Sequence, residues 1–200
     1  MTRRRLTRAE RKEDTRARLL ASAARVFARR GFHAASVEEV AEDAGFSKGA
    51  VYSNFESKTE LGIAVIDELH AREERRLSRL LASAGDPPAQ LDALAAWADE
   101  TIGNRAWTQL EIEVAAASAF DERYRAAAAA RYERLRAGAA EIVHDAFGDA
   151  LDIDTDLLAT AIVGLSLGIG LQRAADRRIR GSALSDFLRA LVPTSVPVAS

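Results

Sequence analysis

Hydrogen-bond donors and a cationic side chain lie close together in residues 47–54. The ammonium group of Lys48 can donate to the O6 and N7 atoms of guanine or to a phosphate, and the amide of Asn54 can contact a base edge or a phosphate. Ser36 and Ser47 are expected at the N-terminal ends of two helices, where free backbone N–H groups favour an anion. These groups are suited to binding double-stranded DNA, a polyanion whose base edges carry hydrogen-bonding groups.

Local helix signals predict the elements that position these groups. Ser36 and Glu39 form a capping box, in which each side chain accepts from the other residue's backbone N–H, so a helix is expected over 37–44. Gly45 follows at the place where a helix commonly ends in a left-handed residue. A second short helix is expected over about 48–54. Two short helices joined by a tight turn form a helix-turn-helix, whose second helix enters the DNA major groove.

Two runs of residues closely resemble the signature of the TetR family of transcriptional regulators: Ser47-Lys48-Gly49-Ala50-Val51-Tyr52-Ser53-Asn54-Phe55 and Ser57-Lys58-Thr59-Glu60-Leu61. The resemblance also covers the first helix and is specific over about residues 12–65. It implies an all-α fold of about nine helices, with an N-terminal three-helix helix-turn-helix domain over residues 1–57. A C-terminal helical domain for effector binding and dimerisation is then expected over residues 58–200.

The resemblance also implies which side chains face DNA. Tyr52 is expected to donate its hydroxyl to a phosphate; the alternative is that its ring packs in the core against the first helix. Gly49 and Ala50 keep the first turn slim, and Lys58 is expected at the DNA backbone. Glu38 stands where some family members have a basic residue, and it either faces solvent or accepts from cytosine N4. The expected DNA-binding residues are Ser36, Ser47, Lys48, Gly49, Ala50, Tyr52, Ser53, Asn54 and Lys58.

Basic residues are concentrated at the N-terminal end of the chain. Residues 1–35 hold eleven Lys and Arg against three Asp and Glu, although the whole chain has a formal net charge of −2. A basic end on an acidic remainder is typical of a DNA-binding domain attached to a body that does not bind DNA. Arg3-Arg4-Arg5, Arg8 and Arg11 form either an arm that follows phosphates or enters a narrow minor groove, or a solvated tail.

The rest of the chain is predicted to be helical. Alanine is abundant and aromatic residues make up only 6%, a composition that favours helices over strands. The first helix is expected over about 14–30, with a possible earlier start at a capping box formed by Thr7 and Glu10. The other expected helices cover about 58–83, 88–103, 106–119, 122–147, 155–177 and 182–192.

Small residues recur within 155–177 at spacings of three, four and seven, and these are Ala161, Gly164, Gly168 and Ala175. They would let this helix approach a second copy closely. The resemblance implies a homodimer through about 155–192, which would place two recognition helices on a near-palindromic operator. The alternative is that 155–177 is simply a buried core helix.

The resemblance further implies a one-component repressor that a small-molecule effector of unknown identity releases from DNA. Helical facing suggests that the effector pocket is lined by Trp97, Trp107, Leu110, Glu111, Val114, Phe120, Tyr124 and Gln172. The alternative is that these side chains fill a core. The chain would then be a ligand-independent or partner-controlled DNA-binding protein.

Several classes of protein are disfavoured by composition and spacing. The chain has no cysteine, and its three histidines show no partner at metal-ligand spacing, so neither a cofactor nor a metal is expected. The Ser, His and acidic residues form no arrangement tied to a catalytic motif, so an enzyme is not expected. The Arg-rich start lacks an apolar secretory region and no run of 18 apolar residues occurs. A cytoplasmic location without membrane attachment is therefore expected.

Overall fold

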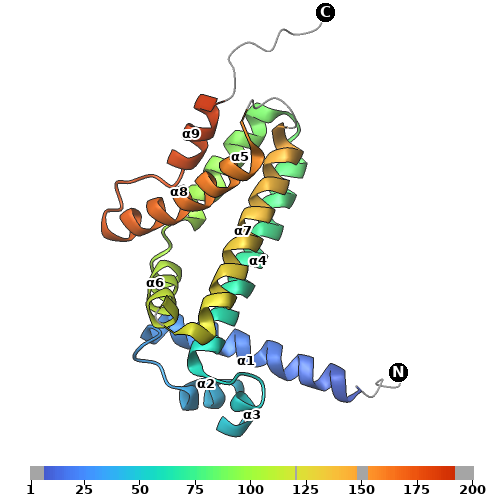
Figure 1. The fold of residues 1–200 in the computed structure, drawn as a ribbon, viewed down its shortest axis with the longest axis vertical. Coiled ribbons are helices and arrows are strands. Elements are labelled where there is room, and N and C mark those ends of the chain that lie inside the picture. The colour runs from blue at the N-terminus through green and yellow to red at the C-terminus, as the bar shows by residue number, and fades with distance from the viewer. Residues whose placement is uncertain (1–6, 120, 148–152, 192–200) are drawn as a thin grey trace, which may run out of the picture. The chain divides into compact units, whose positions relative to one another are not determined.

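The computed structural model describes residues 7–119, 121–147 and 153–191, and this part of the chain is helical with no strand. The all-α fold class is therefore confirmed (Figure 1). The helices are α1 (Arg8–Arg30), α2 (Val37–Ala44), α3 (Lys48–Tyr52), α4 (Lys58–Ala84), α5 (Pro87–Thr101), α6 (Arg105–Ala119), α7 (Glu122–Phe147), α8 (Thr155–Ala175) and α9 (Ala183–Leu191).

The helix ends follow local capping chemistry. Of the two predicted starts for α1 the earlier is correct, because Thr7 and Glu10 form a reciprocal capping box. The end of α3 comes two residues before the predicted one. The side chains of Ser53 and Asn54 both donate to the backbone oxygen of Ala50, at 2.9 and 2.8 Å, and such bonds compete with helix continuation.

The chain divides into two compact units, and each is described by itself. Unit 1 comprises residues 1–69 and 109–128, and unit 2 comprises residues 70–108 and 129–200. The helix-turn-helix thus shares a unit with the beginning of α4, most of α6 and the beginning of α7. This division differs from the expected one between residues 57 and 58, because apolar side chains far along the chain contribute to the core of unit 1.

The core of unit 1 gathers around the aromatic rings at the end of α1. Phe27 and Phe32 pack edge to face with ring centroids 5.4 Å apart. Gly62 on α4 lies against this cluster so closely that a Cβ atom there would stand 2.7 Å from the Phe32 ring and 2.8 Å from a Val114 methyl group. The largest fully buried apolar side chains of this core are Leu19, Val26, Phe27, Val40, Val51, Phe55, Leu61, Val65, Ile66 and Val114.

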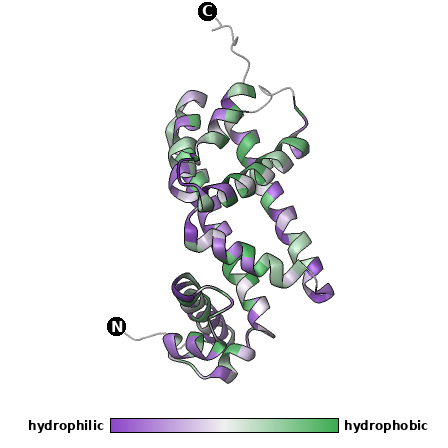
Figure 2. Cartoon of the chain, turned by 90° about the vertical axis from the view of Figure 1, so that its left-hand side faces the viewer, coloured by the Kyte–Doolittle hydropathy of each residue, from purple (hydrophilic) through white to green (hydrophobic). Residues whose placement is uncertain are grey.

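Unit 2 has two apolar clusters. One joins α4, α5, α7, α8 and α9, and its buried members are Leu77, Leu81, Leu91, Leu94, Val143, Leu158 and Leu188. The other is formed by Ala98, Ile102, Ile169 and Leu184. Helix α9 packs on α5 and α8, and Figure 2 shows how hydrophobic and hydrophilic residues are distributed along these helices. Trp97 contacts both clusters.

Candidate nucleic-acid interface

The turn between α2 and α3 has the geometry that its sequence predicts. Ser36 and Glu39 cap α2 reciprocally, with Glu39 N donating to Ser36 Oγ at 3.1 Å and Ser36 N donating to Glu39 Oε2 at 2.8 Å. Gly45 ends α2 with φ 72° and ψ 32°, a left-handed conformation that glycine adopts without steric cost. Ser47 Oγ then accepts from Ala50 N at 3.2 Å and opens α3. These local signals fix the direction of α3 relative to α2.

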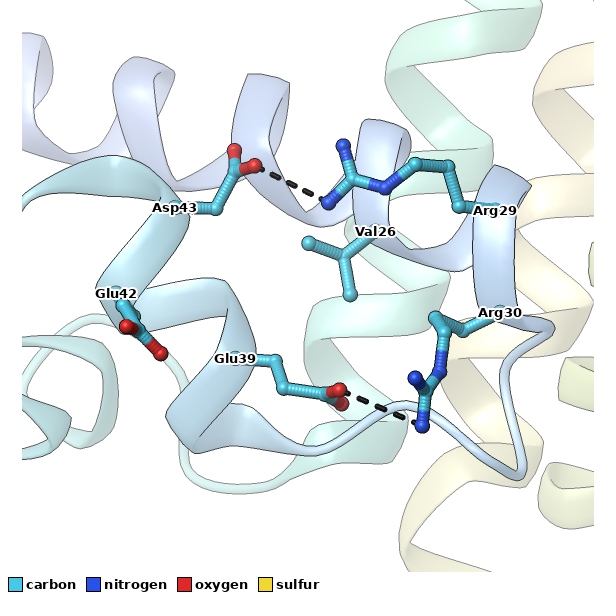
Figure 3. Close-up of a pocket in the computed structure, with 6 residues that line it drawn as sticks. All are labelled: Val26, Arg29, Arg30, Glu39, Glu42 and Asp43. Atoms are coloured by element: carbon cyan, nitrogen blue, oxygen red, sulfur yellow. Dashed lines mark hydrogen bonds and ion pairs between the residues drawn. The ribbon is translucent and has the colours of Figure 1, made fainter.

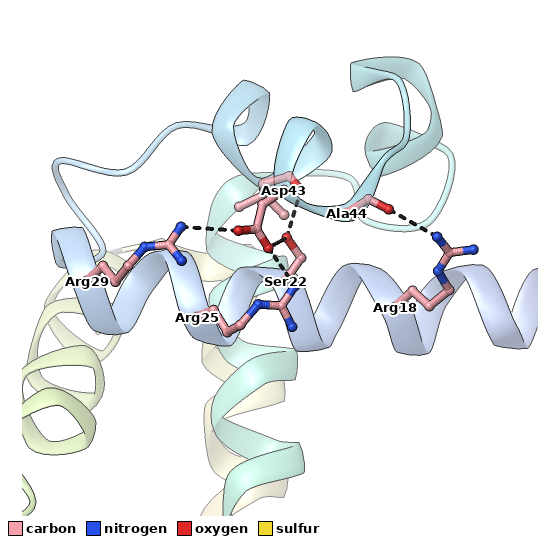
Figure 4. Close-up of polar contacts among 7 residues, drawn as sticks. Arg18, Ser22, Arg25, Arg29, Asp43 and Ala44 are labelled. Carbon is pink, nitrogen blue, oxygen red and sulfur yellow. Dashed lines mark hydrogen bonds and ion pairs between the residues drawn. The ribbon is translucent and has the colours of Figure 1, made fainter.

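A cluster of polar contacts around Asp43 fastens α2 to α1 (Figure 4). Asp43 accepts from Ser22 Oγ at 2.8 Å, Arg25 Nη2 at 2.5 Å and Arg29 Nη2 at 3.2 Å. Arg18 Nη2 also donates to the backbone oxygen of Ala44 at 3.3 Å. These hydrogen bonds, first that from Ser22 and then those from the two arginines, lower the pKa of Asp43 from 3.8 to about 2.

Removing the charge of Asp43 should weaken this attachment in a pH-dependent way. Because the folded-state pKa lies below the ordinary value, the charged carboxylate stabilises the folded protein above pH 3.8, and the contribution is lost as the pH falls towards 2. Asp43→Asn should therefore lower the Tm at neutral pH, and its difference from the wild type should shrink between these two pH values. Thermal unfolding followed by circular dichroism across the range measures this.

The neighbouring Glu42→Gln is the matched control, since Glu42 is exposed and forms no ion pair within the described residues (Figure 3). Its Tm should stay close to that of the wild type at each pH. A constant Tm difference for Asp43→Asn from neutral pH down to pH 2 would show that the carboxylate charge does not hold α2 on α1.

The exposed face of α3 carries the residues best placed to meet DNA. Lys48, Gly49 and Tyr52 are exposed, and Tyr52 retains 46% of its surface. The alternative that the Tyr52 ring packs in the core is therefore wrong. The ammonium group of Lys48 lies 5.8 Å from the centroid of that ring, so the cation and the phenol share one surface. Only Ser47 Oγ, at 3.8 Å, would contact a Cβ atom added at Gly49, which leaves the backbone open to close approach.

Glu38 forms an ion pair with Lys48 across the turn. Glu38 faces solvent, as expected, and the ion pair is an addition that its sequence position did not predict. The hydrogen bond from Lys48 lowers the pKa of Glu38, and the same bond raises the pKa of Lys48. Both side chains remain more than half exposed, so the pair is available to exchange partners with DNA.

The other predicted DNA-binding residues differ in whether their hydrogen-bonding groups already have a partner within the protein. The Ser36 hydroxyl lies 3.2 Å from the Glu39 carboxylate and donates to it, whereas the capping bond of Ser47 uses only its oxygen and leaves its proton for an acceptor. Ser53 and Asn54 are bonded to the carbonyl oxygen of Ala50. The DNA contacts predicted for Ser36, Ser47, Ala50, Ser53 and Asn54 stay predictions.

Lys58 and Glu113 hold the segment between α1 and α2. Lys58 Nζ donates to the His33 backbone oxygen at 3.0 Å and lies 4.7 Å from the Phe32 ring, and burial lowers its pKa. Glu113, on α6, accepts from His33 N at 2.9 Å. Eighty residues separate Glu113 from His33, so no local pattern could have identified this contact. The contact of Lys58 with the DNA backbone stays a prediction.

The basic residues before and within α1 are only partly described. Arg3, Arg4 and Arg5 lie outside the described residues, while Arg8 and Arg11 are exposed on the first turn of α1. Further along, Arg16 Nη1 donates to the Asn54 backbone oxygen at 3.0 Å, and its guanidinium lies 4.3 Å from the centroid of the Phe55 ring. Arg16 therefore supports the end of α3.

A hollow of about 330 Å³ lies between α1 and α2 (Figure 3). Two ion pairs cross it, with Arg29 Nη2 3.2 Å from Asp43 Oδ1 and Arg30 Nη2 3.6 Å from Glu39 Oε1. Val26, two arginines and three acidic side chains line the hollow, and the two ion pairs between helices occupy both arginines. None of the residues predicted to bind an effector lines it.

The residues predicted to bind an effector are divided between the two units, and Phe120 lies outside the described residues. In unit 1, Leu110 and Val114 are buried core residues, and Tyr124 Oη lies 2.5 Å from Ser57 Oγ. The fourth member there, Glu111, is half-buried. This distribution does not define a common pocket.

The residues of unit 2 that are predicted to bind an effector have different surroundings. Trp97 Nε1 donates to Glu73 Oε2 at 3.3 Å. The ring of Trp107 lies 5.5 Å from that of His70. Gln172 is exposed and donates to the Gly168 backbone oxygen. The effector contacts of all these residues stay predictions.

The fold and the surface of α3 define a helix-turn-helix protein of the DNA-binding class. The model of the family described as "Bacterial regulatory proteins, tetR family" matches residues 19–65. The HTH-type transcriptional activator FasR of Mycolicibacterium smegmatis is 48% identical over 55 residues, which are 28% of this chain and 25% of that protein. UidR of Escherichia coli, an HTH-type transcriptional regulator, is 24% identical over 90% of this chain and 92% of its own length. Among solved structures, reduced NemR of E. coli has a TM-score of 0.71 at 22% identity, covering 92% of this chain and 100% of that one.

The DNA-binding region of the chain, residues 19–65, belongs to the TetR family of bacterial regulatory proteins. The matches to the first four curated relatives span only 25–38% of the lengths of those proteins. The close likeness to them is therefore a likeness of the DNA-binding region, and the likeness to NemR is one of fold.

Proposed function

We propose that this protein is a one-component repressor that binds a near-palindromic operator as a homodimer and leaves it when a small-molecule effector binds. The observation that carries the proposal is the exposed face of α3, where Lys48, Gly49 and Tyr52 stand free of the core. The contacts of Asp43 with α1 give that face a rigid support. Pre-positioned donors on a short helix suit the reading of base edges and phosphates in a major groove.

Exposed apolar side chains on α8 and α9 support the dimer. Leu157 and Leu171 are 64% and 55% exposed, and Phe187 on α9 is 38% exposed. By length and composition alone, helix α8 could span a membrane. Only 22% of its most apolar 18-residue stretch is buried within the protomer. Burial against a second copy accounts for such a face in a helix-turn-helix protein. Residue 192, the last of the proposed interface, lies outside the described residues.

The composition of unit 1 supports a route from the effector to the DNA-binding surface. Residues 58–69 of α4 and 109–119 of α6 share a core with α1–α3, and Glu113 and Lys58 hold the segment before α2. An effector that shifts α4 or α6 would change the setting of α3. The coupling is reciprocal, so operator DNA weakens effector binding by the same factor.

A ligand-independent or partner-controlled DNA-binding protein is the second candidate function. The observation that favours it is the burial of Leu110 and Val114, which places two of the residues predicted to line the pocket in the core of unit 1. The two candidates agree on DNA binding and differ only in the response to small molecules.

Genome-wide mapping of bound DNA tests the proposal and supplies the operator. We expect near-palindromic sites, each binding two protomers, and a subset of compounds chosen from the substrates of neighbouring genes should release the protein in fluorescence anisotropy. A fragment mutated in one half-site is the control and should bind much more weakly. Sites without two-fold symmetry would contradict the dimeric reading, and specific binding that no compound changes would favour the second candidate.

A further inference from the structure

A buried arginine on α7 has no use in DNA binding or in the attachment of α2. Arg131 belongs to unit 2, is only 2% exposed and is the largest fully buried side chain among the described residues. Its Nε and Nη1 atoms have no hydrogen-bond partner within the described residues. The guanidinium lies 5.1 Å from the centroid of the adjacent Tyr132 ring.

This arrangement leaves two nitrogen atoms of the Arg131 guanidinium without an acceptor, and no ion pair with Arg131 is found among the described residues. A guanidinium does not lose its proton in a protein, so it cannot become neutral as a buried lysine or histidine can. A buried charge without a counter-charge is strongly unfavourable. The Tyr132 ring attracts the cation through its face, but the N–H groups point outward in the plane of the guanidinium and still require acceptors.

The helix that carries Arg131 offers no counter-charge. Residues three and four positions away on a helix are its neighbours on the same face, and here they are Ala127, Ala128, Arg134 and Leu135. None is acidic, and the two alanines leave little bulk beside the guanidinium. The missing acceptor must therefore come from outside α7.

A second buried donor in the same unit is in a similar state. Trp107 Nε1 is buried and has no acceptor within the described residues. A buried indole N–H normally finds a partner. Unit 2 thus holds at least two buried N–H donor groups without acceptors, one of which is charged.

We propose that Arg131 binds the carboxylate of an organic anion with an apolar body, and that this anion is the effector of the protein. The inference rests on the proposed function, because it assigns a chemical class to the proposed effector. The fork of N–H groups on a guanidinium matches the two oxygens of a carboxylate, and such bidentate pairs are among the strongest hydrogen bonds in proteins. Burial selects an anion whose remainder is apolar over one that is strongly hydrated.

The first arm of the test needs no ligand. Arg131→Met keeps the length of the side chain and removes the charge, so the ligand-free variant should have a higher Tm than the wild type. The control is Arg125→Met on the same helix, where the arginine is exposed and pairs with Glu122 at 2.8 Å, and its Tm should change little. A lower Tm for Arg131→Met would show that the guanidinium already has a compensating partner, and it would overturn the proposal.

The second arm uses octanoate and benzoate as probes, with octanamide and benzamide as neutral counterparts. The carboxylates should raise the Tm of the wild type and the amides should not. In Arg131→Met the carboxylates should bind about ten- to a hundredfold more weakly, the range expected for loss of a charged hydrogen bond. Arg131→Lys should retain part of the affinity because it keeps the charge and loses the fork.

Three further outcomes would overturn the proposal: amides that bind as well as carboxylates, carboxylate binding that survives Arg131→Met, and a wild type that binds neither carboxylate. Inorganic phosphate and sulfate are tested alongside, and a preference for them over the carboxylates would also exclude an organic anion. Operator release is measured separately by fluorescence anisotropy. If another compound releases the protein and Arg131→Met does not alter this response, the proposed role of Arg131 is wrong while the proposed function stands.

Discussion

Replacing both Lys48 and Tyr52 with alanine should abolish specific operator binding in a protein that remains folded. Both side chains are exposed on α3 and neither belongs to the core of unit 1, so their removal should leave the Tm nearly unchanged. Truncating a recognition-helix side chain that binds a base costs about 1–3 kcal/mol, and a dimer carries each substitution twice. The operator affinity measured by anisotropy should therefore fall at least about a hundredfold.

The single variants separate the two proposed roles. Tyr52→Phe removes only the hydroxyl, so it should weaken binding to all operator variants by similar factors if that hydroxyl donates to a phosphate. Lys48→Ala should in addition relax the preference at one base position if the ammonium group contacts guanine.

The control for this series removes a cation from a different unit. Arg178→Ala deletes an exposed arginine in unit 2, and operator affinity should hardly change. Circular dichroism confirms the fold of each variant. A folded Lys48→Ala/Tyr52→Ala protein with normal operator affinity would contradict the assignment of α3 as the recognition helix.

Placing a leucine at Gly168 should break the proposed dimer without unfolding the protomer. A Cβ atom at Gly168 would have no neighbour within 4 Å in one protomer, and leucine is the better helix former by about 1 kcal/mol. Across a close two-fold crossing the same leucine would overpack the interface twice, at a cost of about 1–3 kcal/mol for each site. Sedimentation velocity should show a shift towards monomer, and operator affinity should fall in the same sample.

Ala96→Leu provides the comparison, because it adds the same side chain at an exposed site on α5. It should leave both the sedimentation coefficient and operator binding unchanged. If Gly168→Leu remained a stable dimer with intact operator binding, the interface would lie elsewhere than on α8.

Elements specified by neighbouring residues could be predicted closely from the sequence. The bounds of α2 agree with the prediction because Ser36, Glu39 and Gly45 set both of its ends within ten residues. The bounds of α7 also agree, while α3 ends early because Ser53 and Asn54 bond to a backbone carbonyl, a choice that periodicity does not encode.

Interactions between distant residues could not be predicted in this way. Asp43 reaches Ser22 across 21 positions and Glu113 reaches His33 across 80, and neither acid differs in its sequence context from a solvated one. For the same reason the burial of Leu110 and Val114 in the core of unit 1 could not be foreseen. Helical periodicity shows which side of a helix is buried, but it does not show which other elements that side packs against.

The ion pair between Glu38 and Lys48 has a consequence for how the protein searches DNA. The pair has no net charge. The exposed face of α3 therefore gains little from the general attraction of cations to the phosphate backbone. If Lys48 contacts a base as predicted, attraction to arbitrary DNA would depend on the arginines of α1, and Lys48 would exchange Glu38 for a base only where that base offers the right acceptors. In that case phosphates in a wrong register would repel the Glu38 carboxylate, and the ratio of specific to non-specific affinity would rise even where neither affinity is high.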